Sequence, residues 1–273
     1  MTRPGERPSR RRFLAITAAT AGLGLAGALV PGRGRARVVH EWTGQALGAE
    51  SRLLLAHPDA AAARRVLERC LQEIWRLERI FSLHLAESEL RRLNRDGRLG
   101  AASQDLRLLL AEAGRFGALT GGAFDVTVQP LWRLYADHFA AHPGSPSGPP
   151  RRALEAARAL VDHRAIDVEG AGVRFARPGM AATLNGIAQG YITDRAALLL
   201  REAGFPHVLV QLGETFAGAA PEEGAPWRVG VADPGRPGRL LTALTAENAA
   251  IATSSGRALR FDRAGRHHHL LDP

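Results

Sequence analysis

Residues 58–81, PDAAAARRVLERCLQEIWRLERIF, decide the fold class of this chain. Within this stretch apolar residues recur at spacings of three and four, and most of the residues between them are Arg or Glu. That periodicity predicts a long amphipathic helix with one buried stripe. Because Cys70 lies in the stripe, we expect a buried, unreactive thiol. The whole stripe is Val66, Leu67, Cys70, Leu71, Ile74, Leu77, Ile80 and Phe81.

Shorter helices are predicted on the C-terminal side of this stretch. Ser103 is the expected N-cap of one of them, because a hydroxyl accepts well from the free N–H groups of a first turn. Gly204 is expected just beyond the end of the last helix. The predicted inward residues after Ser103 are Leu106, Leu109, Leu110, Ala113 and Phe116. The other predicted helices are 87–95, 151–160 and 186–203.

Strands are predicted mainly after the helices. A strand pair over 38–56 comes first, and a hairpin joins 166–168 to 173–175 through Glu169–Gly172. Because helices come early, strands come late and no βαβ alternation is visible, we expect an α+β fold. The later predicted strands are 207–212, 227–232, 240–245, 249–252, 257–262 and 266–271, the last two joined by a turn over Asp262–Gly265.

The positive charge is concentrated at the N-terminus. The 273 residues carry a formal charge of +9, and residues 1–37 hold eight arginines against one glutamate. Because a nucleic-acid-binding domain needs a basic patch on its folded part, this distribution argues against that class. SRRRFL at 9–14, followed by an uncharged run to Val30, resembles a twin-arginine export signal. We therefore expect a periplasmic protein, with an uncleaved inner-membrane anchor as the alternative.

Several segments combine glycine with polar side chains. GGAFDVT at 121–127 lets the backbone approach a ligand, although an ordinary Asp cap also explains it. TLNGIAQGY at 183–191 opens a helix whose N-terminus suits a phosphate, but it is neither a Walker loop nor a dinucleotide fingerprint. ATSSG at 252–256 is either a phosphate contact or a Ser/Thr turn. Neighbouring histidines at 267–269 would alternate across a strand, so we expect one of them in proton or phosphate chemistry rather than three on a metal.

Taken together in order, these segments resemble the ApbE family of FAD:protein FMN transferases. The resemblance covers about residues 42–273 and implies an ApbE-type, T-fold-like single domain over 38–273 with a mainly antiparallel sheet. LNGIAQG at 184–190 and the triple His are most similar to the NosX branch, which is associated with nitrous oxide reduction. The matching segments are 81–82 with 88–90 and Asn94; 122–125 with 127–128 and 130–131; 186–191 with Asp194; 227–231 with 233–234; 252–256; and 269–273.

The resemblance implies a transferase that binds FAD and a magnesium ion. Such enzymes cleave the pyrophosphate of FAD and attach FMN through a phosphoester to a Ser or Thr of a target protein. The implied partners are FAD, the twin-arginine machinery and an exported or membrane electron-transfer protein such as the NosX-associated NosR. No nucleic acid is expected.

The resemblance also implies the site. Leu47 and His84 stand where a Met and a Tyr contact the flavin, and Gly186 offers a backbone carbonyl to magnesium. His269 is the candidate for proton handling. The implied flavin-binding residues are Leu47, His84, Ala123, Phe124, Asp125, Thr183, Gln189, Thr253 and Ser254.

The family pattern extends beyond the position of Pro273. Its next segment carries an Ala-Asp-Ala-x-x-Thr-like motif whose Asp and Thr side chains bind magnesium. We therefore expect the chain to be C-terminally incomplete. A second hypothesis follows, in which the protein holds FAD, as a flavin-binding protein or chaperone, without cleaving it.

Overall fold

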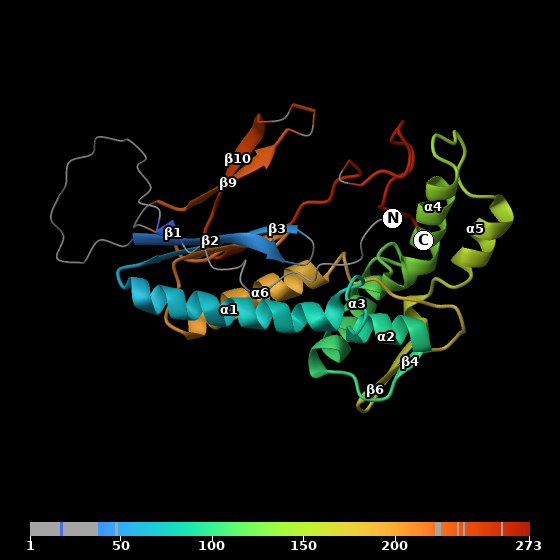
Figure 1. Ribbon diagram of the computed structural model, residues 1–273, viewed down its shortest axis with the longest axis horizontal. Coiled ribbons are helices and arrows are strands. Elements are labelled where there is room, and N and C mark those ends of the chain that lie inside the picture. The colour runs from blue at the N-terminus through green and yellow to red at the C-terminus, as the bar shows by residue number, and fades with distance from the viewer. Residues whose placement is uncertain are drawn as a thin grey trace, which may run out of the picture. The chain divides into compact units, whose positions relative to one another are not determined.

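The computed structural model describes residues 17–18, 38–46, 49–221, 225–233, 235–236, 238–257 and 259–273. The expected export signal therefore lies outside the described residues except for β1 (Thr17–Ala18), and so does Leu47. The described residues form helices and antiparallel sheets (Figure 1). The chain divides into two compact units. The first takes the residues up to Glu73, Thr193–Val231 and Leu240–Ile251; the second takes the rest.

The first unit is built on a six-stranded sheet in the order β1-β2-β3-β7-β8-β11. The expected strand pair is confirmed, since β2 and β3 form nine antiparallel pairs, from Val38 with His57 to Ala46 with Ala49. β8 was not predicted, because three residues are too few for a periodicity. The strands of this sheet after β1 are β2 (Val38–Ala46), β3 (Ala49–His57), β7 (Val208–Gln211), β8 (Thr215–Ala217) and β11 (Ala249–Ile251).

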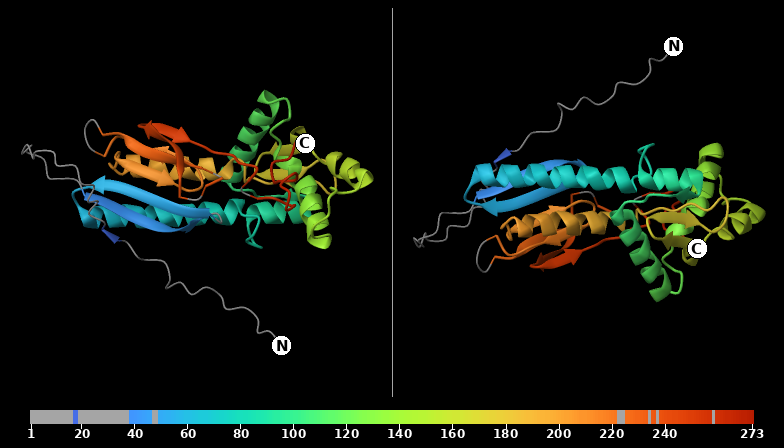
Figure 2. Two further views of the ribbon diagram at one scale, coloured as in Figure 1. Left: turned by 90° about the horizontal axis from the view of Figure 1, so that it is seen from above. Right: turned by 90° about the horizontal axis from the view of Figure 1, so that it is seen from below.

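Two helices lie side by side along this sheet (Figure 2). They are α1 (Ala60–Phe81) and α6 (Ala188–Glu202), each of which contributes residues to both units. The predicted stripe of α1 is buried throughout. Cys70 is fully buried, its thiol lies 3.8 Å from the carbonyl oxygen of Ala196, and burial raises its pKa to about 12. The expected inert thiol is therefore confirmed.

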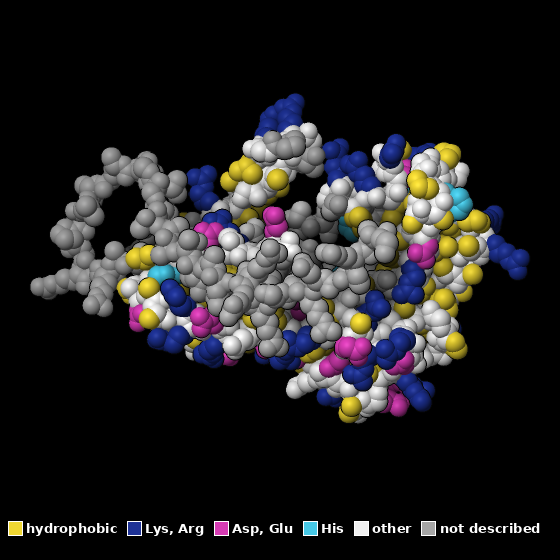
Figure 3. Space-filling model, in the orientation of Figure 1, with side chains coloured by type: hydrophobic (Ala, Val, Ile, Leu, Met, Phe, Trp, Pro, Cys, Tyr) yellow, Lys and Arg dark blue, Asp and Glu magenta, His cyan; other side chains and the backbone are white. Residues whose placement is uncertain are grey.

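A separate two-stranded sheet pairs β9 (Trp227–Ala232) with β10 (Leu240–Ala246), and both strands were predicted. Trp227 is buried with Leu209 and Ala217 of the six-stranded sheet. β10 exposes three leucine side chains on its two faces, and Figure 3 shows apolar side chains at this part of the surface. These are Leu240, Leu241 and Leu244.

The second unit is mainly helical. The side chains of Ser88 and Ser103 cap α2 and α3 as N-cap acceptors, which confirms the prediction for Ser103. The predicted hairpin is β5 with β6, and β4 adds an unpredicted third strand. The elements are α2 (Glu89–Asp96), β4 (Arg98–Leu99), α3 (Gln104–Leu119), the 3-10 helix η1 (Val126–Val128), α4 (Gln129–Ala141), α5 (Arg151–Arg158), the 3-10 helix η2 (His163–Ala165), β5 (Ile166–Glu169) and β6 (Gly172–Phe175).

Three expectations for this unit were wrong. Phe116 is 38 % exposed rather than inward, because it lies near the end of α3 against Phe124. Instead of the strands expected at 257–262 and 266–271, the described residues there form one antiparallel bridge, Arg260 with His268. The turn between these two residues is closed by a hydrogen bond from the His267 N–H to Asp262. The helix α4 had not been predicted. Within the described residues, no helix is long and apolar enough to cross a membrane.

Candidate functional site

Asp125 lies buried at the start of η1, in the segment expected to contact flavin. Its Oδ1 accepts hydrogen bonds from the backbone N–H of Thr127 at 2.7 Å and from the Thr127 hydroxyl at 2.5 Å. An Asp two residues before a free N–H is the usual N-cap arrangement, and the sequence Asp-Val-Thr permits it here. Asp125 therefore anchors the segment through its side chain.

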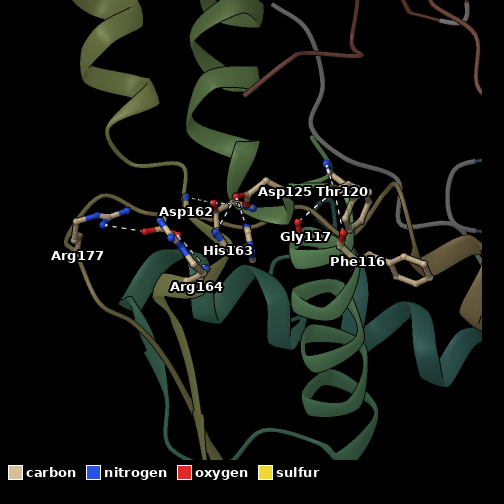
Figure 4. Close-up of polar contacts among 10 residues, drawn as sticks. Phe116, Gly117, Thr120, Asp125, Asp162, His163, Arg164 and Arg177 are labelled. Carbon is tan, nitrogen blue, oxygen red and sulfur yellow. Dashed lines mark hydrogen bonds and ion pairs between the residues drawn. The ribbon is translucent and has the colours of Figure 1, made fainter. Parts of the chain in front are cut away.

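The other oxygen of Asp125 faces a residue that the sequence did not indicate (Figure 4). Oδ2 accepts from the backbone N–H of His163 at 2.7 Å and lies 3.2 Å from its Nδ1. The N–H of the preceding Asp162 donates to the Thr127 hydroxyl at 2.7 Å. Arg164 donates to the Asp162 carboxylate and lowers its pKa. Three hydrogen bonds thus join 125–127 to 162–163. His163 was missed because its partners are distant in sequence.

Phe124 stands beside this anchor. Its N–H donates to the Thr120 hydroxyl at 2.9 Å, and its ring meets that of Phe116 edge to face. Gly121 and Gly122 both have positive φ, which glycine adopts without strain. The chain thus turns away from the end of α3 before Phe124.

The loop before α6 meets the Phe124 segment. The N–H of Thr183 donates to the carbonyl of Val126 at 2.7 Å. A Cβ on Gly186 would lie 3.2 Å from Cε2 of Phe124, so the glycine backbone lies close to the ring. Gly186 is exposed, and Gln189 in the first turn of α6 is half-buried. The structure therefore brings Phe124, Thr183 and Gly186 together.

His84 is exposed in the loop between α1 and α2. Its N–H donates to the Ser82 hydroxyl at 3.0 Å, which fixes the start of the loop. Phe81, at the end of α1, meets Tyr191 edge to face at 5.6 Å. The His84 loop is therefore tied to the same end of α6 that carries Gln189.

Thr253, Ser254 and His269 belong to a second group of residues near the end of the chain. Thr253 and Ser254 are exposed. The N–H and the Nδ1 of His269 both lie 3.1 Å from the carbonyl oxygen of Leu259. Because a carbonyl only accepts, Nδ1 carries the proton and Nε2 of the neutral ring keeps its lone pair. His269 is thus set up to receive a proton at Nε2.

The other two histidines of the run do something different. His267 and His268 line a cavity of about 260 Å³ between α4, α5 and the chain end. The ring of His267 lies 5.7 Å from that of Tyr135, and His268 packs so closely on Gly256 that a Cβ there would lie 2.9 Å from its ring. The two rings thus have different close neighbours, although both line the same cavity.

The described residues do not fit a magnesium site. Within that part of the chain, no three His, Cys, Asp or Glu side chains lie close enough to hold a metal ion. The predicted ligand Gly186 offers only its backbone carbonyl, whereas magnesium takes near-octahedral oxygen ligands that usually include a carboxylate.

Comparison with known proteins identifies the family of this chain. The ApbE family pattern matches residues 47–273. The chain is 29 % identical over 220 residues to the FAD:protein FMN transferase of Vibrio cholerae, covering 79 % of this chain and 64 % of that one. It is 30 % identical over 201 residues to that of Haemophilus influenzae, covering 70 % and 58 %. The chain thus spans under two thirds of the length of these two relatives.

Solved structures show the same fold. The flavin transferase ApbE of Vibrio cholerae superposes with a TM-score of 0.71 at 25 % identity, covering 86 % of this chain and 77 % of that one. The ApbE protein of Thermotoga maritima gives 0.74 at 26 % identity, covering 86 % and 76 %. The fold is therefore the one that these two solved proteins share. The chain belongs to the ApbE family.

Proposed function

We propose that this protein is an FAD:protein FMN transferase. Family membership and the names of its relatives support the activity. The observation that carries it in this chain is the approach of the Phe124 ring to the Gly186 backbone. An aromatic ring beside an exposed, side-chain-free backbone offers a planar flavin both a stacking surface and close backbone contact.

The reaction uses FAD and a protein hydroxyl. The oxygen of an acceptor Ser or Thr forms a bond to the phosphorus of the FMN half. The bond from that phosphorus to the bridging oxygen breaks, and AMP leaves with that oxygen. The hydroxyl proton passes to a base, for which Nε2 of His269 is our candidate because its Nδ1–H is engaged by Leu259.

The alternative is a protein that holds FAD without cleaving it. The observation that favours this alternative is the lack of a metal-ligand cluster among the described residues. Both hypotheses require flavin binding, and only the transferase releases AMP.

The proposed acceptor and compartment rest on sequence motifs alone. We infer an exported or membrane electron-transfer acceptor of the NosR kind and a periplasmic enzyme delivered by the twin-arginine route. The basis is the SRRRFL segment at 9–14 and the LNGIAQG segment at 184–190. Export can be tested by fusing residues 1–37 to a reporter and comparing it with a variant in which Arg11 and Arg12 are replaced by Gln.

The test of the activity uses the purified chain, FAD, magnesium and a Ser/Thr-containing acceptor domain. Mass spectrometry of the acceptor reports FMN addition, and chromatography reports AMP. Matched controls use the acceptor with its hydroxyl residue changed to Ala, and EDTA in place of magnesium. FMN on the acceptor with equimolar AMP supports the transferase. Bound FAD without AMP supports the holding role, and no FAD binding refutes both.

A further inference from the structure

His163 is placed to control the geometry of the Phe124 segment, although it lies outside the short motifs on which the resemblance rests. It begins η2, and its side chain is 12 % exposed. Both its backbone N–H and its Nδ1 are directed at Oδ2 of Asp125, at 2.7 and 3.2 Å. One carboxylate oxygen therefore fixes both the backbone and the ring of the same residue.

The protonation of this contact follows from the partners. Asp125 already accepts from the N–H and hydroxyl of Thr127 and from the N–H of His163. All three of these partners donate to Asp125, and its oxygens act as acceptors in each contact. Nδ1 of His163 therefore carries the proton and donates.

The ring is also held from the side. A Cβ on Gly117 of α3 would come within 2.6 Å of Cγ and Cδ2 of His163, closer than real Cβ contacts allow. The ring therefore lies directly on the helix backbone at Gly117, and this close packing leaves it little room to move (Figure 4). A hydrogen bond to a charged group and tight packing together favour one orientation.

The two residues that flank Asp125 both contact the loop before α6. Val126, the next residue, accepts the N–H of Thr183 at 2.7 Å, and Phe124, the preceding one, meets Gly186. A shift of Asp125 would therefore move both sides of the candidate flavin site.

We propose that His163 is a positioning residue, whose Nδ1–H holds Asp125 and through it sets the spacing between Phe124 and the Thr183–Gly186 loop. The flavin consequences of this role rest on the proposed function. The proposed effect of His163 on the protein itself does not depend on that function, because the Asp125 contact and the Thr183 hydrogen bond form without any ligand.

Two amide variants test whether the position of the side-chain N–H matters, or only the presence of a polar side chain at residue 163. His163→Asn places its side-chain N–H where Nδ1 stands, whereas His163→Gln places it where Nε2 stands, one methylene further out. His142→Asn at the exposed end of α4 is the matched control. Hydrogen exchange of the Thr127 and Thr183 amides is measured in the full chain, together with FAD affinity from flavin fluorescence.

We expect His163→Gln to speed exchange of both amides about tenfold and to weaken FAD binding about tenfold, the effect of losing one hydrogen bond to a charged group. His163→Asn and His142→Asn should stay within about threefold of the wild type, well below that tenfold loss. A Gln variant with wild-type exchange at Thr183 overturns the proposal.

If the Gln variant unfolds, the Asn variant tests the proposal instead. Wild-type exchange and FAD affinity in the Asn variant support the proposal, and unfolding of the Asn variant overturns it. If wild-type protein binds no FAD, the proposed function fails while the exchange result still stands.

Discussion

The side-chain amide of Asn94 pairs with both polar backbone groups of Ala182. Its Nδ2 donates to the Ala182 carbonyl at 2.8 Å, and its Oδ1 accepts from the Ala182 N–H at 2.7 Å. Asn94 lies on α2, and Ala182 immediately precedes Thr183 of the candidate site. One side chain thus does for this segment what a neighbouring strand does in a sheet.

Replacing Asn94 by Ala is therefore expected to destabilise the protein. Ala182 is fully buried, so its N–H and C=O would be left without partners. Each such loss costs about 1–3 kcal/mol, and we expect the free energy of unfolding to fall by about 2–4 kcal/mol. Urea denaturation measures it. Gln72→Ala, on the exposed face of α1, is the control and should change it by less than about 0.5 kcal/mol. Equal effects of the two changes would contradict the role of Asn94.

Two glycines of α3 should respond oppositely to Ala. In an exposed or open helical position, Gly→Ala stabilises by about 0.5–1 kcal/mol. At Gly114 nothing lies within 4 Å of an added Cβ, so Gly114→Ala should raise the thermal midpoint. At Gly117 the Cβ would lie 2.6 Å from the His163 ring, so Gly117→Ala should lower stability by about 1–3 kcal/mol through overpacking. Stabilisation by both changes would show that the ring moves aside freely.

Elements that depend on local sequence could be predicted. The α1 stripe, the Ser103 cap and the hairpin at 166–175 were predictable, because each is encoded within a few residues by periodicity, a cap or a turn. Phe124, Thr183 and Gly186 were recognised through resemblance, and the structure brings them together. The roles of the individual flavin and metal contacts stay predictions.

What could not be predicted is long-range pairing. His163 meets Asp125 across 38 positions, and Asn94 meets Ala182 across 88. A lone His or Asn carries no local signal of such a partner, because the contact depends on how distant segments pack. The short strands β4 and β8 were missed for the same reason, since two or three residues gain their strand conformation only from a neighbour.

The buried thiol of Cys70 predicts a loss of stability at high pH. Burial raises its folded-state pKa from 9.0 to about 12, so the unfolded chain releases this proton first as pH rises. The contribution is complete below pH 9 and declines by about 1.4 kcal/mol per pH unit between pH 9 and 12. The chain has no lysine, which leaves few other groups titrating in that window. Urea denaturation at pH 8 and 10 should show a larger decrease for wild type than for Cys70→Ala. Identical pH dependence in the two proteins would refute the assignment.

His269 supplies the sharpest test of the proposed chemistry, because its two ring nitrogens have separate tasks. Nδ1–H is held by the Leu259 carbonyl at 3.1 Å, and Nε2 is the proposed proton acceptor. His269→Asn keeps a donor near the Nδ1 position but has no base. We expect it to lower kcat for FMN transfer by about 10²–10⁴, the usual contribution of general-base catalysis, while FAD affinity changes less than about threefold.

His142→Asn, an exposed histidine at the end of α4, is the control and should leave both quantities unchanged. Single-turnover transfer at saturating FAD gives the rate, and flavin fluorescence gives the affinity. A loss confined to FAD affinity would make His269 a binding residue, since the chemical step would then proceed without it. A loss of rate at constant affinity would assign the proton transfer to Nε2, because the Asn amide preserves the Leu259 contact and removes only the base.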